Sequence, residues 1–373
     1  MKLTSEKIKN LSIVTVVGAR PQFVKASAVS RLIDSKPNVD EFIIHTGQHY
    51  DHNMSGLFFE ELGIRKPDVN LGIESKRHGD QTGRMLSAIE CHLIDQKPDW
   101  VLVYGDTNST LAGALAASKL NIPVAHVEAG LRSFNRKMPE EVNRVVTDHL
   151  SDLMFAPTIA AVENLRREGR AMEHVINVGD VMYDVALRVA GKAAHQSDIL
   201  TLNNLRRGTY VLGTVHRAEN TDDRSRLEAI VNGVSKAAEH VEIVLPLHPR
   251  TRERMRQHGL SLSSNVRIID PVGYLDMTSL LISASSVFTD SGGVQKEAYF
   301  HGVPCLTLRD ETEWGELVSL GWNTLLPPVH EDEIAEAIGS IKRPQMSDSK
   351  PLVYGNGNTS SLILEHLMTM AAR

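Results

Sequence analysis

Three carboxylates in the first half of the chain stand where α/β proteins carry functional groups. Asp106 follows a predicted strand after Gly105, Glu128 directly follows the next one, and Glu140 lies just inside a helix that Pro139 opens. Clustered carboxylates raise one another's pKa, which can pair a general acid with a general base. Each has a plainer explanation, in which Asp106 is a helix N-cap and Glu140 forms a surface ion pair with Arg144. All three together favour acid–base chemistry.

Two basic residues follow the first predicted strand. The motif Gly18-Ala19-Arg20-Pro21 stands there, and Lys25 comes one helical turn later. A G-x-G-x-x-G fingerprint is missing from this position, which argues against a nicotinamide or flavin dinucleotide, and we expect no cofactor. Arg20 and Lys25 near a helix start fit a phosphate group, although two solvated surface charges are an equal alternative.

The segment from Thr289 to Glu297 predicts an anion site in the second half of the chain. A strand ends, Ser291, Gly292 and Gly293 follow, and a helix starts at once. Glycines let the backbone approach a ligand, and the free N–H groups at a helix start attract an anion. Ser291 can cap this helix, and Glu297 can accept hydrogen bonds from sugar hydroxyls. A tight turn before a capped helix is the plainer reading.

Histidines suggest a substrate contact and, more weakly, a metal. His216 ends the first strand of the second half, where functional residues of such sheets gather. His45, His49 and His52 match no standard zinc spacing and have no cysteine beside them. We therefore predict a role for His216 and no metal site.

Buried strands alternating with helices predict the elements that position these residues. Two successive series of this kind predict two doubly wound, Rossmann-like parallel-sheet domains, which bind ligands at the C-terminal ends of their strands. The boundary is placed after Gly179, giving domains 1–179 and 180–357, with a last helix within 358–373. The predicted strands are 11–17, 41–45, 100–104, 122–127, 152–155, 175–178, 210–215, 241–245, 266–269, 286–289, 304–308 and 323–326.

Composition excludes several classes of function. The chain has 373 residues, with 46 acidic and 40 basic side chains and a formal charge of −6. That balance argues against a nucleic-acid binder, and no apolar run is long enough for a membrane helix. The first ten residues lack the apolar core of a signal peptide, so we expect a cytoplasmic protein with buried, free thiols at Cys91 and Cys305.

Taken in order, the motifs resemble the non-hydrolysing UDP-N-acetylglucosamine 2-epimerase family across nearly the whole chain. Each motif alone is weak evidence, but the ordered set is specific. The motifs are GARP at 18–21, GDT at 105–107, VEAGLR at 127–132, PEEVNR at 139–144, His216-Arg217, DSGGVQKE at 290–297, RDETE at 309–313 and YGNG at 354–357.

The resemblance implies a fold of the GT-B type, with a UDP-sugar in an interdomain cleft, a last helix that returns to the first domain, and a homodimer. It implies inversion at C2 by elimination of UDP and re-addition to a bound 2-acetamidoglucal. Asp106, Glu128 and Glu140 would then serve as acid–base groups, with Arg144 in the same site. His216 and the helix start at Ser291 would stabilise the leaving diphosphate, and Glu297 would bind the ribose.

The sequence departs from the commonest family pattern at Trp314, at Gly179-Asp180 and at Gln48–Met54. These departures resemble the branch that acts on UDP-2,3-diacetamido-2,3-dideoxy-glucuronate and supplies surface polysaccharide. They also put in doubt the regulatory UDP-sugar site that some members have near their Gln-His motif. The alternatives are a UDP-sugar glycosyltransferase on the same scaffold, a hydrolysing 2-epimerase and a non-enzymatic sugar-nucleotide sensor.

Overall fold

The computed structural model describes residues 10–47, 65–75, 77–342 and 351–371, apart from the side chains of Arg20 and Ala371. The chain forms two compact units. The first unit consists of Met1–Val185 and Leu352–Arg373, and the second of Ala186–Pro351. The limit between them falls inside helix α7 (Val181–Gln196), a few residues after the predicted boundary at Gly179.

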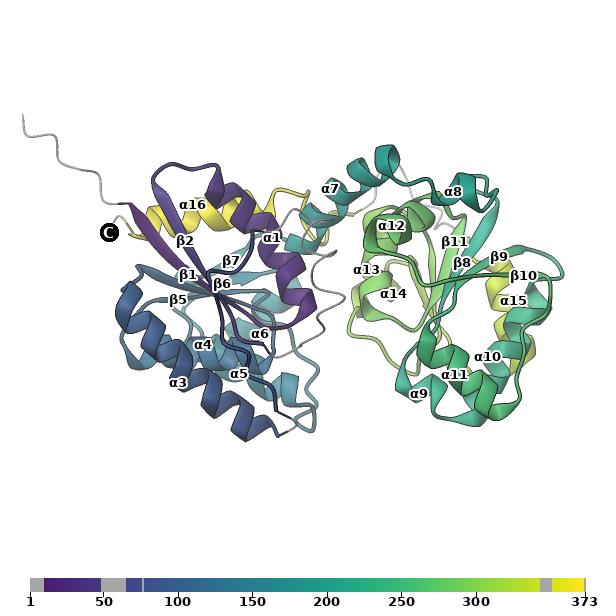
Figure 1. Ribbon diagram of the computed structural model, residues 1–373, viewed down its shortest axis with the longest axis horizontal. Coiled ribbons are helices and arrows are strands. Elements are labelled where there is room, and N and C mark those ends of the chain that lie inside the picture. The colour runs from purple at the N-terminus through teal and green to yellow at the C-terminus, as the bar shows by residue number, and fades with distance from the viewer. Residues whose placement is uncertain (1–9, 48–64, 76, 343–350, 372–373) are drawn as a thin grey trace, which may run out of the picture. The chain divides into compact units, whose positions relative to one another are not determined.

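The first unit is built on a seven-stranded parallel sheet in the order β3-β2-β1-β4-β5-β6-β7 (Figure 1). Its strands are β1 (Leu11–Val17), β2 (Val39–His45), β3 (Val69–Asn70), β4 (Trp100–Tyr104), β5 (Val124–Val127), β6 (Leu153–Ala156) and β7 (Val175–Asn177). β1 pairs with β4. β2 and β3 lie on the far side of β1, whereas β5, β6 and β7 lie on the far side of β4, so the strand order reverses between β1 and β4. Ligands of such sheets bind at this reversal.

Helices cover both faces of this sheet. Figure 1 shows α1 and α16 on one side and α3, α4 and α5 on the other. The C-terminal helix α16 contacts α1, and Thr359 donates a 3.0 Å hydrogen bond to the Val178 carbonyl. The helices of this unit are α1 (Arg20–Asp34), α3 (His78–Gln96), α4 (Asn108–Lys119), α5 (Pro139–Leu150), α6 (Ile159–Arg167), the 3₁₀ turn η1 (Met172–His174), the first residues of α7, and α16 (Thr359–Ala371).

The second unit repeats the architecture with six parallel strands in the order β10-β9-β8-β11-β12-β13. The strands are β8 (Tyr210–Thr214), β9 (Glu242–Pro246), β10 (Val266–Ile269), β11 (Ser286–Thr289), β12 (Cys305–Thr307) and β13 (Asn323–Leu325). The helices are α8 (Ile199–Leu202), α9 (Ala218–Thr221), α10 (Arg224–Ala237), α11 (Pro249–His258), α12 (Tyr274–Ser283), α13 (Gly292–Phe300), α14 (Gly315–Ser319) and α15 (Glu331–Ser340). Here the order reverses between β8 and β11.

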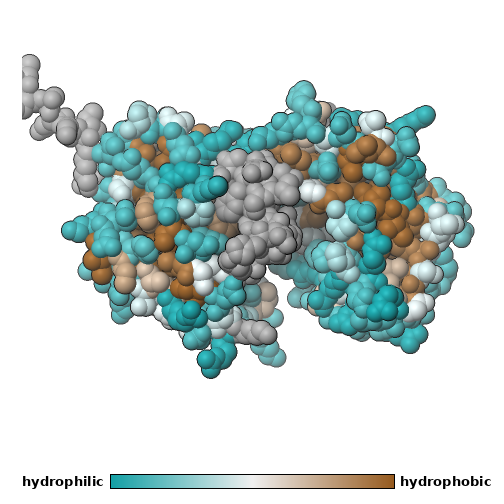
Figure 2. All heavy atoms as spheres, viewed as in Figure 1, coloured by the Kyte–Doolittle hydropathy of each residue, from teal (hydrophilic) through white to brown (hydrophobic). Residues whose placement is uncertain are grey.

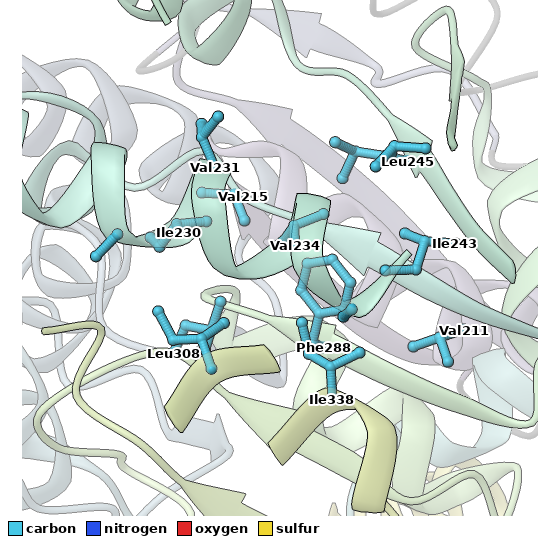
Figure 3. Packing of buried hydrophobic residues seen from close by; sticks show 14 of the residues in the cluster. Val211, Val215, Ile230, Val231, Val234, Ile243, Leu245, Phe288, Leu308 and Ile338 are labelled. Atoms are coloured by element: carbon cyan, nitrogen blue, oxygen red, sulfur yellow. The ribbon is translucent and has the colours of Figure 1, made fainter. Parts of the chain in front are cut away.

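One core of the second unit lies between its sheet and helices α10 and α15 (Figure 3). Phe288 of β11 is fully buried at its centre, and Ile338 of α15 packs beside it. Gly213 makes room for this ring, because a Cβ atom at that position would lie 2.2 Å from the Phe288 Cζ atom. The glycine on β8 is therefore needed for close approach of the phenyl ring.

These observations confirm the predicted fold class of two doubly wound parallel-sheet domains. The two-residue strand β3 was not predicted, because it is too short to show a pattern. The expectation of a buried thiol is wrong for Cys91, which is exposed on α3, whereas Cys305 is buried. Among the described residues, no helix has the length and apolar character needed to cross a membrane. In the face shown in Figure 2, hydrophilic side chains surround the exposed apolar ones.

Candidate functional site

The turn after β4 places Asp106 beside a cation. Gly105 has a φ of +63°, which suits a residue without a side chain, and the chain turns sharply there. The N-cap of α4 is Thr107, whose hydroxyl accepts a 3.3 Å hydrogen bond from Thr110 N, so the reading of Asp106 as N-cap is wrong. The Asp106 carboxylate instead forms an ion pair with Arg144 Nη2 from α5.

Arg144 forms ion pairs with Asp106 and Glu141 but not with Glu140. Its Nη1 lies 2.8 Å from Glu141 Oε2, while Glu140 is exposed one residue earlier on α5. The Glu140–Arg144 surface pair that the spacing suggested is therefore not formed. Burial opposes ionisation of Glu141, but hydrogen bonds from Ser133 and Phe134, together with the Arg144 charge, lower its pKa. Glu141 thus holds Arg144 in place, a role that the sequence did not reveal.

Glu128 forms a second ion pair at the end of the neighbouring strand β5. Its Oε2 contacts Lys25 Nζ of α1, and only 10% of the Glu128 side chain and 13% of the Lys25 side chain are exposed. Its backbone has a φ of +74°, which costs a non-glycine residue roughly 1–2 kcal/mol. The turn after β4 lies against this pair, since a Cβ atom on Gly105 would be 3.3 Å from Glu128 Oε2. Strain of this kind is typical of functional positions.

A buried histidine lies behind both turns. His126 of β5 is fully buried, with Nε2 2.7 Å from the Gly105 carbonyl oxygen and Nδ1 2.7 Å from Asp148 Oδ1. Asp148 also accepts from Gly130 N at 3.0 Å and pairs with Arg132 at 2.7 Å. Sequence reasoning missed this network. The available signal was a histidine in the middle of an otherwise apolar strand.

In the second unit a buried acid organises the segment that carries His216. Asp290 is fully buried and accepts hydrogen bonds from His216 N at 3.0 Å and from Arg217 N at 2.9 Å. Asn220 Nδ2 donates to the same carboxylate at 3.2 Å. The His216 ring is partly exposed, with Nδ1 3.4 Å from Asp290 Oδ1. The ring of His248, which the sequence did not suggest, lies beside it, with the ring centres 5.4 Å apart and the ring planes tilted by 35°.

The glycine-rich turn after β11 leads directly into α13, as predicted. Ser291 occupies the N-cap position but makes no side-chain capping bond, so the expected cap is not formed. Gly292 and Gly293 are the first two residues of the helix. The Trp314 indole N–H donates to the Gly292 carbonyl at 3.0 Å, and Lys296 Nζ lies 4.2 Å from the centre of its ring.

The remaining predicted residues are placed as follows. Glu297 Oε1, on α13, accepts a 2.9 Å hydrogen bond from the Tyr274 hydroxyl. Arg20 is the first residue of α1, but its side chain lies outside what the structure describes. His49 and His52 of the weak metal hypothesis also lie outside the described residues, as does the segment 48–54 near the suspected regulatory site.

The geometry therefore divides the predicted residues between the two units. The first unit brings together Asp106, Glu128, Lys25 and Arg144 at the C-terminal ends of β4 and β5 and on the helices α1 and α5 beside them. The second unit places His216 after β8 and Ser291–Gly293 after β11, on both sides of its strand reversal.

Comparison with known proteins gives the family. The profile described as UDP-N-acetylglucosamine 2-epimerase matches residues 31–368. The UDP-2,3-diacetamido-2,3-dideoxy-D-glucuronate 2-epimerase of Pseudomonas aeruginosa is 51% identical over 96% of this chain and 99% of its own. The UDP-N-acetylglucosamine 2-epimerase of Methanocaldococcus jannaschii is 44% identical over 96% of this chain and 99% of its own.

Solved structures agree with the sequence relatives. A crystal structure of the Methanocaldococcus jannaschii UDP-GlcNAc 2-epimerase, in complex with UDP-GlcNAc and UDP, has a TM-score of 0.81 and 43% identity, covering 96% of this chain and 99% of the other. The Neisseria meningitidis UDP-GlcNAc 2-epimerase bound to UDP-GlcNAc also has a TM-score of 0.81, at 30% identity, covering 96% of this chain and all of the other.

Fold and strand-end residues define an enzyme with two Rossmann-like domains, in which ion-paired carboxylates and a glycine-rich helix start lie at the C-terminal ends of strands at or beside the strand reversals. Within that class, the chain belongs to the UDP-N-acetylglucosamine 2-epimerase family. The resemblance read from the motifs is thereby confirmed, as is the prediction that the protein is a sugar epimerase.

Proposed function

We propose that this enzyme inverts C2 of a UDP-2-acetamido sugar without net hydrolysis. The observation that carries the proposal is the pair of partly buried carboxylate–cation contacts, Asp106–Arg144 and Glu128–Lys25, at adjacent strand ends in a chain of this family. The C2–H bond breaks only if a base takes the proton while negative charge leaves at C1. Carboxylates supply the base, and fixed cations stabilise the charge that develops.

The reaction then runs in two balanced steps. A carboxylate takes the C2 proton, the C1–C2 double bond forms, and the C1–O bond breaks with its electron pair on UDP. In the return step a second acid protonates C2 on the opposite face and the UDP oxygen re-forms its bond to C1. We assign the proton transfers to Asp106, Glu128 and Glu140, each typically contributing about 10²–10⁴-fold. Glu140 is exposed on α5, so it depends most on the substrate for its position.

We assign the nucleotide to the second unit. Ser291, Gly292 and Gly293 present backbone N–H groups to the diphosphate, as helix starts do for anions. His216 adds a donor, and the partly buried carboxylate of Glu297 receives the ribose hydroxyls beside Tyr274. Arg20 and Lys25 complete the set of cations for the leaving group. The reaction needs no cofactor, because the C2 proton and UDP leave and return without a change in oxidation state.

We propose UDP-2,3-diacetamido-2,3-dideoxy-glucuronate as the preferred substrate, with UDP-N-acetylglucosamine as the alternative. The 51% identity to an enzyme named for the uronate supports this choice, and so does Trp314, which stands where the common family pattern has arginine. The product would be a mannuronate-type unit for surface polysaccharide, and the enzyme would work as a homodimer.

The test is incubation of the purified protein with each UDP-sugar in D₂O without an acceptor, followed by NMR. We expect deuterium at C2 of both epimers, intact UDP-sugar, and faster exchange with the diacetamido-uronate. Free UDP released in proportion to free sugar would indicate a hydrolysing epimerase. Absence of C2 deuterium with both substrates, while UDP still binds, would leave a glycosyltransferase as the better assignment and would overturn the proposal.

A further inference from the structure

The buried histidine behind the first-unit turns faces acceptors on both sides. His126 Nε2 lies 2.7 Å from the carbonyl oxygen of Gly105, which has no hydrogen to donate. His126 Nδ1 lies 2.7 Å from Asp148 Oδ1. A neutral imidazole has one N–H and one lone pair, so it satisfies only one of these two contacts unless the acid carries a proton.

The surroundings of Asp148 favour the carboxylate over the acid. Its Oδ2 accepts from Gly130 N at 3.0 Å and lies 2.7 Å from Arg132 Nη2. Although burial opposes ionisation, the contacts with His126 and Arg132 lower the pKa of Asp148. Arg132 is itself paired with Glu168 at 2.6 Å, and His149 lies 3.7 Å from Glu168. Asp148 and the partly exposed Glu168 thus place two carboxylates around the buried side chains of Arg132 and His126, and a buried carboxylate needs charged or N–H partners.

This pair ties together the segments that carry the candidate acid–base groups. His126 lies on β5, two residues before Glu128. Its ring contacts the carbonyl of Gly105, the residue directly before Asp106. Asp148 lies on α5, one turn after Arg144, and holds the N–H of Gly130, two residues after Glu128. A single buried contact therefore links both turns and the helix.

We propose that His126 is a positioning residue held as a doubly protonated imidazolium by Asp148, and that its charge-assisted bond to the Gly105 carbonyl fixes the Asp106 and Glu128 turns for proton transfer. Its effect on turnover rests on the proposed epimerase function. Its protonation state does not, so the two can fail separately.

The protonation state is tested by ¹⁵N NMR of ring-labelled histidine in the full chain between pH 6.5 and 8.5. His126 is assigned by comparison with His126→Phe. We expect both ring nitrogens of His126 to carry protons throughout this range. One unprotonated ring nitrogen at neutral pH would show a neutral histidine beside a protonated acid, and would overturn the proposal.

Asp148→Asn tests the role in turnover with almost no change in shape. The amide oxygen still accepts from Gly130 N, and the amide NH₂ donates to Nδ1 of a histidine that is now neutral. We expect kcat for C2 exchange to fall about 10- to 100-fold, the range for losing a charged hydrogen bond, while UDP affinity changes less than about threefold. Unchanged kcat, or an equal loss of UDP affinity, would refute the positioning role.

Asp152→Asn is the matched control, because Asp152 Oδ2 accepts from Val124 N at 2.9 Å at the opposite end of the same strand. It makes the same chemical change without touching His126, and should leave kcat and the His126 signals unchanged. Thermal melts establish that each variant is folded. If the wild type shows no C2 exchange, the proposed function fails, and the NMR result still decides the state of His126.

Discussion

Replacing Glu41 with glutamine should remove a pH-dependent loss of folding stability from the first unit. Glu41 lies on β2, is buried, and accepts hydrogen bonds from Thr15 at 2.5 Å and Ser30 at 3.0 Å through Oε1. Its Oε2 is also buried and has no hydrogen-bond partner among the described residues. Burial, only partly offset by these hydroxyls, raises the pKa of Glu41 from 4.5 to about 7.

The raised pKa of Glu41 makes the first unit less stable as the pH increases. An acid with a raised pKa binds its proton more tightly in the folded protein, so stability is lost as the pH rises from 4.5 through 7. A shift of this size corresponds to about 3 kcal/mol once the pH lies well above 7, and to about 2.5 kcal/mol between pH 5 and pH 8. Glutamine keeps the acceptor for Thr15 and Ser30 and never ionises, so Glu41→Gln should gain this amount relative to the wild type.

Amide hydrogen exchange in the strands β2 and β4 measures the opening free energy of the first unit without interference from the second. The difference between Glu41→Gln and the wild type should widen steadily from pH 5 to pH 8. Glu74→Gln, an exposed position of the first unit before α3, serves as control and should give no pH-dependent difference. A difference for Glu41→Gln that stays constant with pH would refute the reasoning, because the carboxyl would then ionise equally in both states.

Other substitutions probe the site and the core. Asp106→Asn should keep UDP affinity within about threefold by calorimetry while C2 exchange falls about 10²–10⁴-fold; unimpaired exchange would remove Asp106 from the base role. Lys25→Met should cost about 3 kcal/mol in urea unfolding because the largely buried Glu128 carboxylate loses the cation of its ion pair, and adding Glu128→Gln should recover part of it; strictly additive losses would contradict a direct pair. Gly213→Ala should cost about 1–3 kcal/mol through its clash with Phe288, and Phe288→Leu should relieve it; an equal loss in the double variant would contradict the clash.

The architecture could be predicted because buried parallel strands leave a plain signal. The mostly apolar runs at β1 and β4 appear in the sequence with the same bounds as in the structure, since both faces of these strands are covered. β3 has two residues and no such run, so its pairing with β2 depends on tertiary contacts that sequence pattern does not contain.

The sequence predicted candidate site residues, but it did not predict the side chains that hold them. Strand ends and glycine turns pointed to Asp106, Glu128 and Ser291, whereas the spacing paired Arg144 with the wrong acid. Spacings of three and four residues both place side chains on one helix face, so Glu140 and Glu141 are both possible partners of Arg144. Glu141 is the partner in the structure, because the backbone N–H groups of Ser133 and Phe134 bind its carboxylate. Such a choice depends on the path of a loop, which periodicity does not report.

Both units use a buried acid to hold the turns that carry their candidate groups. Asp148 binds Gly130 N and His126 in the first unit, and Asp290 binds the backbone N–H groups of His216 and Arg217 in the second. A carboxylate that accepts several N–H groups fixes the backbone in one arrangement, because leaving any of those donors buried and unpaired is costly. The acids proposed to meet the sugar, such as Asp106, are then held by their turns and need not supply that rigidity themselves. Substitutions at Asp290 should therefore impair the role proposed for His216 in C2 exchange, even though Asp290 is fully buried and His216 keeps its own side chain.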